Sequence, residues 1–231
     1  MKTPESLSLL ENERKIGTEP FTTGGEPLGF HAVSFWQWAH SDLSGHLIRG
    51  VLAEYLVAEA LGVATGVRDP SLPFDLRSPG GLQIEVKSAA SLQSSSRREP
   101  STISFSIRET RAWDSAANEM SEVSSRQADL YVFALLAHRD PGTLNPLELS
   151  QWEFYLLPAE TLADREGSRK LLTLQSLLLL GPERATFEGL AGAVRRFEDH
   201  DQREPAGVGM AGRAAETLSP DRQGGFLPVH F

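Results

Sequence analysis

The sequence contains no cysteine among its 231 residues. Structural disulfides, cysteine-ligated zinc and cysteine nucleophiles are therefore excluded. Long hydrophobic runs are also missing, since even the four leucines at 177–180 fall far short of a bilayer span. The first fifteen residues carry too many acids and too little apolar sequence for a secretory signal. We therefore expect a cytoplasmic protein that has no membrane partner.

Positive charge is scarce, because 22 lysines and arginines stand against 31 acids, which gives a formal net charge of −9. Proteins that bind phosphate backbones usually present a basic face, so this balance argues against a nucleic-acid partner. Net charge is a sum over the whole molecule, however, and a local basic groove can coexist with it. Arginines interleaved with acids between residues 97 and 126 fit either such a groove or an ordinary solvated surface.

Several catalytic motifs are absent as well. None of the six histidines forms the i, i+4 pair of a helical zinc site. No G-x-S-x-G elbow and no P-loop occur, so serine-hydrolase and nucleoside-triphosphatase functions have no support.

The length suits one domain with a substantial core. We expect a loosely ordered arm over 1–28, a single domain over 29–199 and a flexible tail, rich in glycine and proline, over 200–231. Trp36 and Trp38 resemble a base-stacking pair, but core packing is the preferred interpretation.

The clearest helix is predicted over HLIRGVLAEYLVAEAL, with Ser41 or Ser44 as its cap and Gly62 as its end. Its few polar residues predict burial on most sides. Strands follow at 73–77, 82–88 and 101–107, a polar helix at 110–127, and buried strands at 129–137 and 152–158. A further helix is expected over 185–198. This order predicts an α/β fold with a mixed sheet flanked by helices.

One strand carries candidate chemistry. Glu85 and Lys87 are two residues apart and therefore lie on the same face. Asp75 precedes them across a short hairpin, and in one register it sits opposite Glu85 at about 5 Å. Two carboxylates that close repel unless a cation joins them, and oxygen ligands suit Mg²⁺ or Mn²⁺. The carbonyl of Val86 is a further candidate ligand, and Lys87 is suited to act on the attacking water or on a phosphate.

Glu54 is the next candidate, because an apolar surround on the predicted helix would make its carboxylate costly to bury without a partner. The same metal would be such a partner. Glu59, on another side of the helix, is its rival.

Three segments, RGVLAEYLVAEALG, PFDL and LQIEVKSAA, together resemble the PD-(D/E)xK restriction-endonuclease-like superfamily. The resemblance covers about residues 45–137 and implies an α-βββ-α-β core. It implies catalytic roles for Glu54, Asp75, Glu85 and Lys87, the first three as metal ligands. The chain departs from the family's Pro-Asp dipeptide, since Phe74 precedes Asp75 and Pro73 stands one place early. Gln93 resembles a polar position that some members carry after the motif.

The function implied is a Mg²⁺-dependent endonuclease that cuts DNA in restriction or anti-phage defence, an analogy at the level of the fold. A homodimer and an activating protein partner are both compatible with it. Four residues are the expected nucleic-acid contacts, namely Gln93, Arg97, Arg98 and Arg126. The first alternative is a catalytically silent subunit that binds DNA or a protein. A nuclease acting on RNA or on a nucleic-acid structure is a weaker one.

Overall fold

The computed structural model describes residues 13–70, 72–92, 102–114 and 119–201. Its centre is a five-stranded sheet in the order β11-β9-β8-β4-β3. These strands are β3 (Leu76–Arg77), β4 (Gln83–Ala90), β8 (Leu130–Leu136), β9 (Trp152–Pro158) and β11 (Glu183–Ala185). β4 and β8 are parallel and the other pairs antiparallel, so the predicted mixed sheet is confirmed.

β8 is the middle strand, and all seven of its residues are buried. Its near-continuous apolar sequence follows from this position, because both of its faces are covered. β9 lies beside it, with buried aromatic residues such as Phe154 and Tyr155 on opposite faces. The strands predicted at 129–137 and 152–158 are thus confirmed.

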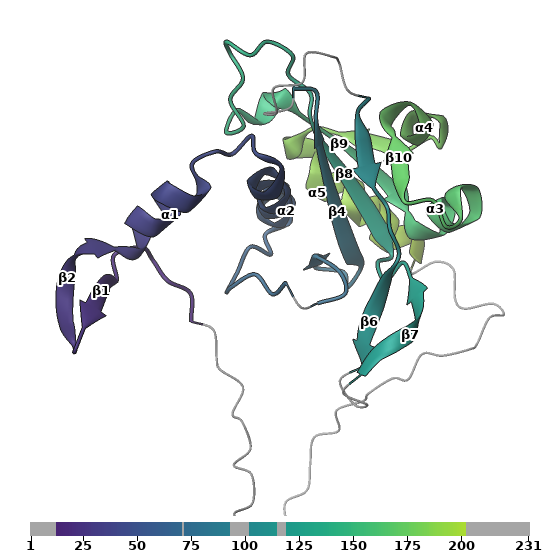
Figure 1. The fold of residues 1–231 in the computed structure, drawn as a ribbon. Helices are drawn as coiled ribbons and strands as arrows, with labels where there is room; N and C mark the ends of the chain where they lie inside the picture. The colour runs from purple at the N-terminus through teal and green to yellow at the C-terminus, as the bar shows by residue number, and fades with distance from the viewer. Residues whose placement is uncertain (1–12, 71, 93–101, 115–118, 202–231) are drawn as a thin grey trace, which may run out of the picture.

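Each face of the sheet has its own cover (Figure 1). On one face, α2 (His46–Leu61) and α5 (Phe187–Asp201) pack against Ile84 and Val86 of β4. The other face is covered by α3 (Ala159–Glu166), α4 (Leu174–Leu179) and a two-stranded sheet of β5 (Ser104–Ser106) and β10 (Leu171–Thr173). One turn of 3-10 helix, η1 (Leu149–Gln151), leads into β9. The predicted helices on a mixed sheet are therefore present.

α2 begins and ends where the sequence predicts, but its N-cap differs. Gly62 ends it in the left-handed region at φ 70°, which favours glycine. Gly45 is the N-cap, so a cap by Ser41 or Ser44 was wrong: the Asp42 carboxylate accepts the backbone N–H groups of Ser44 and Gly45 instead. Most of the helix is buried or half-buried, as predicted, and one exposed stripe comprises Leu47, Val51 and Tyr55.

The helix predicted over 110–127 was wrong. This segment forms an antiparallel hairpin of β6 (Thr110–Asp114) and β7 (Glu119–Ser125). The stretch has no apolar stripe at helical spacing, so a helix would have no face to bury, whereas two strands satisfy each other's backbone groups. β5 also pairs with β10 and not with the central sheet. The expected α-βββ-α-β order is therefore not reproduced by the described residues.

The N-terminal region is more ordered than predicted for the part described. β1 (Pro20–Thr23) and β2 (Glu26–His31) form a hairpin whose turn uses Gly24 and Gly25 at positive φ. Phe21 stacks on Phe30 with ring centroids 4.7 Å apart. The domain boundary predicted after residue 28 falls inside β2.

The helix that follows the hairpin, α1 (Ala32–His40), has no buried residue. Core packing of Trp36 and Trp38 was therefore wrong, as the 84% exposure of Trp38 shows. Figure 1 shows α1 and the hairpin projecting away from the central sheet, which explains the exposure. The predicted tail begins within the last two residues of α5, and its remainder, 202–231, lies outside the described residues. In the part of the chain that the structure describes, no helix is both long and apolar enough to cross a membrane.

Candidate functional site

The candidate site forms where β3 ends beside β4. The register pairs Leu76 with Ile84 and Arg77 with Gln83. Asp75 comes one residue before this paired stretch, so the predicted pairing of Asp75 opposite Glu85 lies just outside it. The Asp75 N–H donates to the Ile84 carbonyl at 3.0 Å, so Asp75 stays hydrogen-bonded to β4 beside Glu85. A short edge strand therefore brings the two carboxylates together.

The hairpin turn before β4 is hydrogen-bonded to a residue far along the chain, on α5. The Glu198 carboxylate of α5 accepts hydrogen bonds from the Ser78 hydroxyl and, at 2.7 Å, from the Gly80 N–H. The Ser78 hydroxyl oxygen in turn accepts the Leu82 N–H at 3.1 Å. Ser78 is buried, so these partners fix the turn that connects Asp75 to β4.

The alternation along β4 is as predicted. Ile84 and Val86 face the core beneath α2 and α5, whereas Glu85 and Lys87 are half-buried on the other face. The Lys87 ammonium forms an ion pair with the Glu85 carboxylate, and their side chains are 26% and 15% exposed. The two charges are thus neutralised by each other in a site that retains access to solvent.

Val86 contributes backbone groups to the same edge. Its N–H donates to Asp75 Oδ2 at 2.8 Å. In an extended strand the N–H and C=O of one residue point to the same side. The carbonyl of Val86 is therefore directed toward the Asp75 edge, beyond the end of β3.

Asp75 is the most perturbed carboxyl of the site. Burial, and after it the neighbouring Glu85 and Glu54 carboxylates, raise its pKa from 3.8 to about 7, against the opposing effect of the Val86 N–H and Lys87. Burial also raises the pKa of Tyr131 to about 12, and the Glu85 carboxylate contributes to this shift. Negative charge is therefore concentrated here beyond what the local cations offset, which is typical of functional sites.

Glu54 reaches this site from α2, whereas its rival Glu59 is exposed. Arg68 holds the Glu54 carboxylate with both arms of its guanidinium, through Nε and through Nη2 at 2.9 Å to Oε1. Nothing in the sequence pattern identified Arg68, because it lies in an irregular loop. Glu54, Arg68 and Asp75 line a cleft of about 610 Å³ between α2 and the loop that leads to β3, which we name the carboxylate cleft.

The donor atoms suit a hard divalent cation, since they comprise three carboxylates and one directed carbonyl. Their present arrangement does not form a metal centre: within the described ranges, no group of three or more carboxylate or histidine side chains is placed to hold a metal ion. Glu54 and Glu85 instead point to Arg68 and Lys87. A metal would therefore require both glutamates to exchange a cationic partner for the ion.

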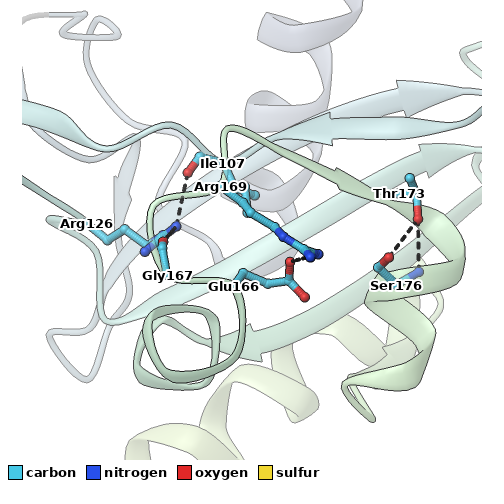
Figure 2. Close-up of polar contacts among 7 residues, drawn as sticks. All are labelled: Ile107, Arg126, Glu166, Gly167, Arg169, Thr173 and Ser176. Carbon is cyan, nitrogen blue, oxygen red and sulfur yellow. Dashed lines mark hydrogen bonds and ion pairs between the residues drawn. The ribbon is translucent and has the colours of Figure 1, made fainter.

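Arg126 is the one predicted nucleic-acid contact within the described residues, and its side chain is only 5% exposed. Figure 2 shows it donating to the carbonyls of Gly167, at 2.7 Å, and Ile107. It also pairs with Glu109 at 3.5 Å. These bonds join the loop before β8 to the segments after α3 and β5, a structural role. The other three predicted contacts, Gln93, Arg97 and Arg98, lie outside the described residues.

Comparison with known proteins found no family model that matches the chain and no curated protein that matches its sequence.

Proposed function

We propose that this protein is a Mg²⁺-dependent deoxyribonuclease that hydrolyses DNA phosphodiester bonds, acting as an endonuclease in restriction or anti-phage defence. The observation that carries the proposal is the Asp75 carboxyl, which accepts the Val86 N–H at 2.8 Å near the Glu85 carboxylate and has its pKa raised to about 7. A buried carboxyl next to other carboxylates is costly in a structural role. It is suited to a site completed by a divalent cation.

Four groups would hold the ion: the Asp75 and Glu85 carboxylates, the Val86 carbonyl and Glu54 from α2. A Mg²⁺ ion there would supply Lewis-acid chemistry toward a phosphodiester and activate water. With Glu85 holding the ion, the Lys87 ammonium would be free of its ion pair. Lys87 would then orient the attacking water or neutralise the phosphate, from the same face of β4.

The experiment uses supercoiled plasmid, linear duplex and single-stranded DNA, each with Mg²⁺, Mn²⁺ or chelator. We expect metal-dependent cutting by the wild-type protein and none by Glu85→Gln. Glu153→Gln serves as the matched control, since Glu153 lies on β9 in an exposed pair with Arg184. Nicking of the closed circle identifies an endonuclease. Cleavage that persists in chelator, or in Glu85→Gln, would rule the proposed site out.

A second candidate function is a catalytically silent subunit that binds DNA or a protein partner. The ion pairs of Glu54 with Arg68 and of Glu85 with Lys87 favour it, because they neutralise two of the three carboxylates without a metal. Intact, folded protein that binds DNA but shows no heat of Mn²⁺ binding would select this function. Tight Mn²⁺ binding without cleavage would instead indicate an enzyme that needs an activating partner.

A further inference from the structure

A second cavity, of about 580 Å³, lies beside the first turn of α2. Its walls come from that turn, from β4 and from β5 with the residues that follow it. Lys87 and Val86 line it, so it adjoins the candidate site. We name it the cationic cavity.

The charge of this cavity is one-sided. Its lining includes Arg49, Lys87, Arg108 and His46, and no acidic side chain among the described residues lines it. In a chain with a net charge of −9, such a gathering of bases is unexpected on composition alone. Lys87 has Glu85 as its partner, but that carboxylate is not part of the lining.

Arg49 is the decisive residue, because it is buried with only part of its guanidinium bonded. It is 6% exposed, and its Nη1 donates to the Ser44 carbonyl at 2.9 Å while Nη2 lies 3.5 Å from His46 Nδ1. Its Nε has no hydrogen-bond partner among the described residues. No described carboxylate pairs with it, and burial lowers its pKa from the ordinary value. A buried cation with a free donor is costly unless an anion completes its surroundings.

Neutral donors surround the bases. Three serines, Ser88, Ser104 and Ser106, line the same cavity. A forked guanidinium, an ammonium and several hydroxyls form the donor set that binds phosphate oxygens, which need several directed hydrogen bonds. The first turn of a 16-residue helix adds its partial positive charge.

We propose that the cationic cavity binds a phosphate group of a nucleic-acid strand, adjacent to the phosphate that the candidate site receives. As part of a strand path, this inference rests on the proposed function through the shared Lys87. The phosphate is either one within the strand or one at its end, and the chemistry of recognition is the same. The acidic character of the whole chain then poses no obstacle to binding DNA, because the contact is local.

The test measures binding in chelator, where no metal-dependent cutting occurs. The two probes are 12-nucleotide single strands with a 3′ fluorophore, one bearing a 5′-phosphate and the other a 5′-hydroxyl. Fluorescence anisotropy measures their binding. Arg108→Gln is the main variant, because Arg108 is exposed and its loss leaves the core intact. Arg49→Met is the second, and Arg165→Gln on α3, exposed and outside the cavity, is the control.

We expect Arg108→Gln to weaken binding roughly tenfold, with the salt slope reduced by about one, while Arg165→Gln binds as the wild type does. A loss confined to the 5′-phosphorylated probe assigns the cavity to a strand end, and an equal loss for both probes assigns it to an internal phosphate. Unchanged binding by Arg108→Gln and by folded Arg49→Met, or an equal loss in Arg165→Gln, would overturn the proposal.

The two proposals fail separately. If the wild-type protein does not cut DNA and Arg108→Gln weakens probe binding, the phosphate-binding proposal stands and the nuclease proposal fails. If the wild-type protein cuts DNA and Arg108→Gln binds both probes as tightly as the wild type does, the nuclease proposal stands and the phosphate-binding proposal fails.

Discussion

α2 lines two cavities of opposite character, one with each half of its length. Its first turn gives His46 and Arg49 to the cationic cavity, whereas Glu54, further along, faces the carboxylate cleft. Residues five apart on a helix point in directions well over a right angle apart, so one helix separates the two charges. The net charge of −9 for the whole chain therefore predicts the charge of neither cavity. Burial and helix geometry decide which charged side chains line each one.

The largest expected effect comes from Lys87, which lines the cationic cavity and forms an ion pair with Glu85 of the candidate site. Lys87→Ala should reduce DNA cleavage by about 10²–10⁴-fold, the usual range for a positioned acid or base. It should also weaken binding of the probe in chelator, because it removes a cation from the cationic cavity.

The measurement is single-turnover cleavage with Mn²⁺, next to anisotropy. Lys170→Ala is the control, since Lys170 is exposed and lies outside both cavities. Cleavage by Lys87→Ala at the wild-type rate would show that Lys87 has no role in the reaction.

Asp75→Asn tests whether the ionised Asp75 carboxylate lowers the stability of the folded protein when no metal is bound. The folded pKa of Asp75, about 7, exceeds its ordinary 3.8, so the folded state holds a proton that the unfolded state has lost between these values. Wild-type stability should therefore fall as pH rises from about 4 to about 7. At pH 8, Asp75→Asn should be more stable in chelator by on the order of 3 kcal/mol, and the gain should vanish below about pH 4.

Denaturant unfolding at pH 4, 6 and 8 measures this difference, with the exposed Asp164→Asn on α3 as the control. A variant that is destabilised at pH 8 would mean that the Asp75 carboxylate is stabilising as it stands. The same substitution should abolish cleavage.

Glu198→Ala asks how far the carboxylate cleft depends on its distant anchor. It leaves the buried Ser78 hydroxyl and the Gly80 N–H without their acceptor, which costs about 1–2 kcal/mol. Because the turn then positions Asp75 less firmly, we expect cleavage to fall while probe binding in chelator is unchanged. Urea unfolding and both assays measure this, with the exposed Glu188→Ala on α5 as the control. Equal losses in cleavage and binding would show that the two cavities are not independent.

Arg68→Ala is expected to have the smallest effect, and to favour the metal. Arg68 competes with a metal for Glu54, so its removal should tighten Mn²⁺ binding by roughly fivefold, which corresponds to about 1 kcal/mol. Calorimetry with Mn²⁺ gives the affinity, and Arg139→Ala, exposed and outside the cleft, is the control. Weaker Mn²⁺ binding would mean that Arg68 organises the cleft and does not compete within it.

The parts of the site that sequence predicts depend on short-range regularities. A period of two places Glu85 and Lys87 on one face, and a short turn brings Asp75 back against β4 near Glu85. The helical pattern and its terminal glycine likewise locate α2, and with it Glu54.

The parts that sequence misses depend on contacts between distant segments. Arg68 binds Glu54 from a loop that has no regular sequence pattern. Arg126 donates to backbone carbonyls whose positions no sequence spacing predicts. The unbonded Nε of Arg49 is a property of burial, which a helical wheel does not give. The β6–β7 hairpin shows the same limit, because strand pairing overrides a polar sequence without a strong local preference.

The most direct test of the central claim is calorimetric titration of the wild-type protein and of Asp75→Asn with Mn²⁺ at pH 8. The account predicts a binding isotherm for the wild type that saturates near one equivalent, with proton release as the pH is lowered toward 7, and no such isotherm for the variant. If Mn²⁺ binds neither protein, or binds both alike, the carboxylate cleft is not a metal site and the nuclease proposal fails.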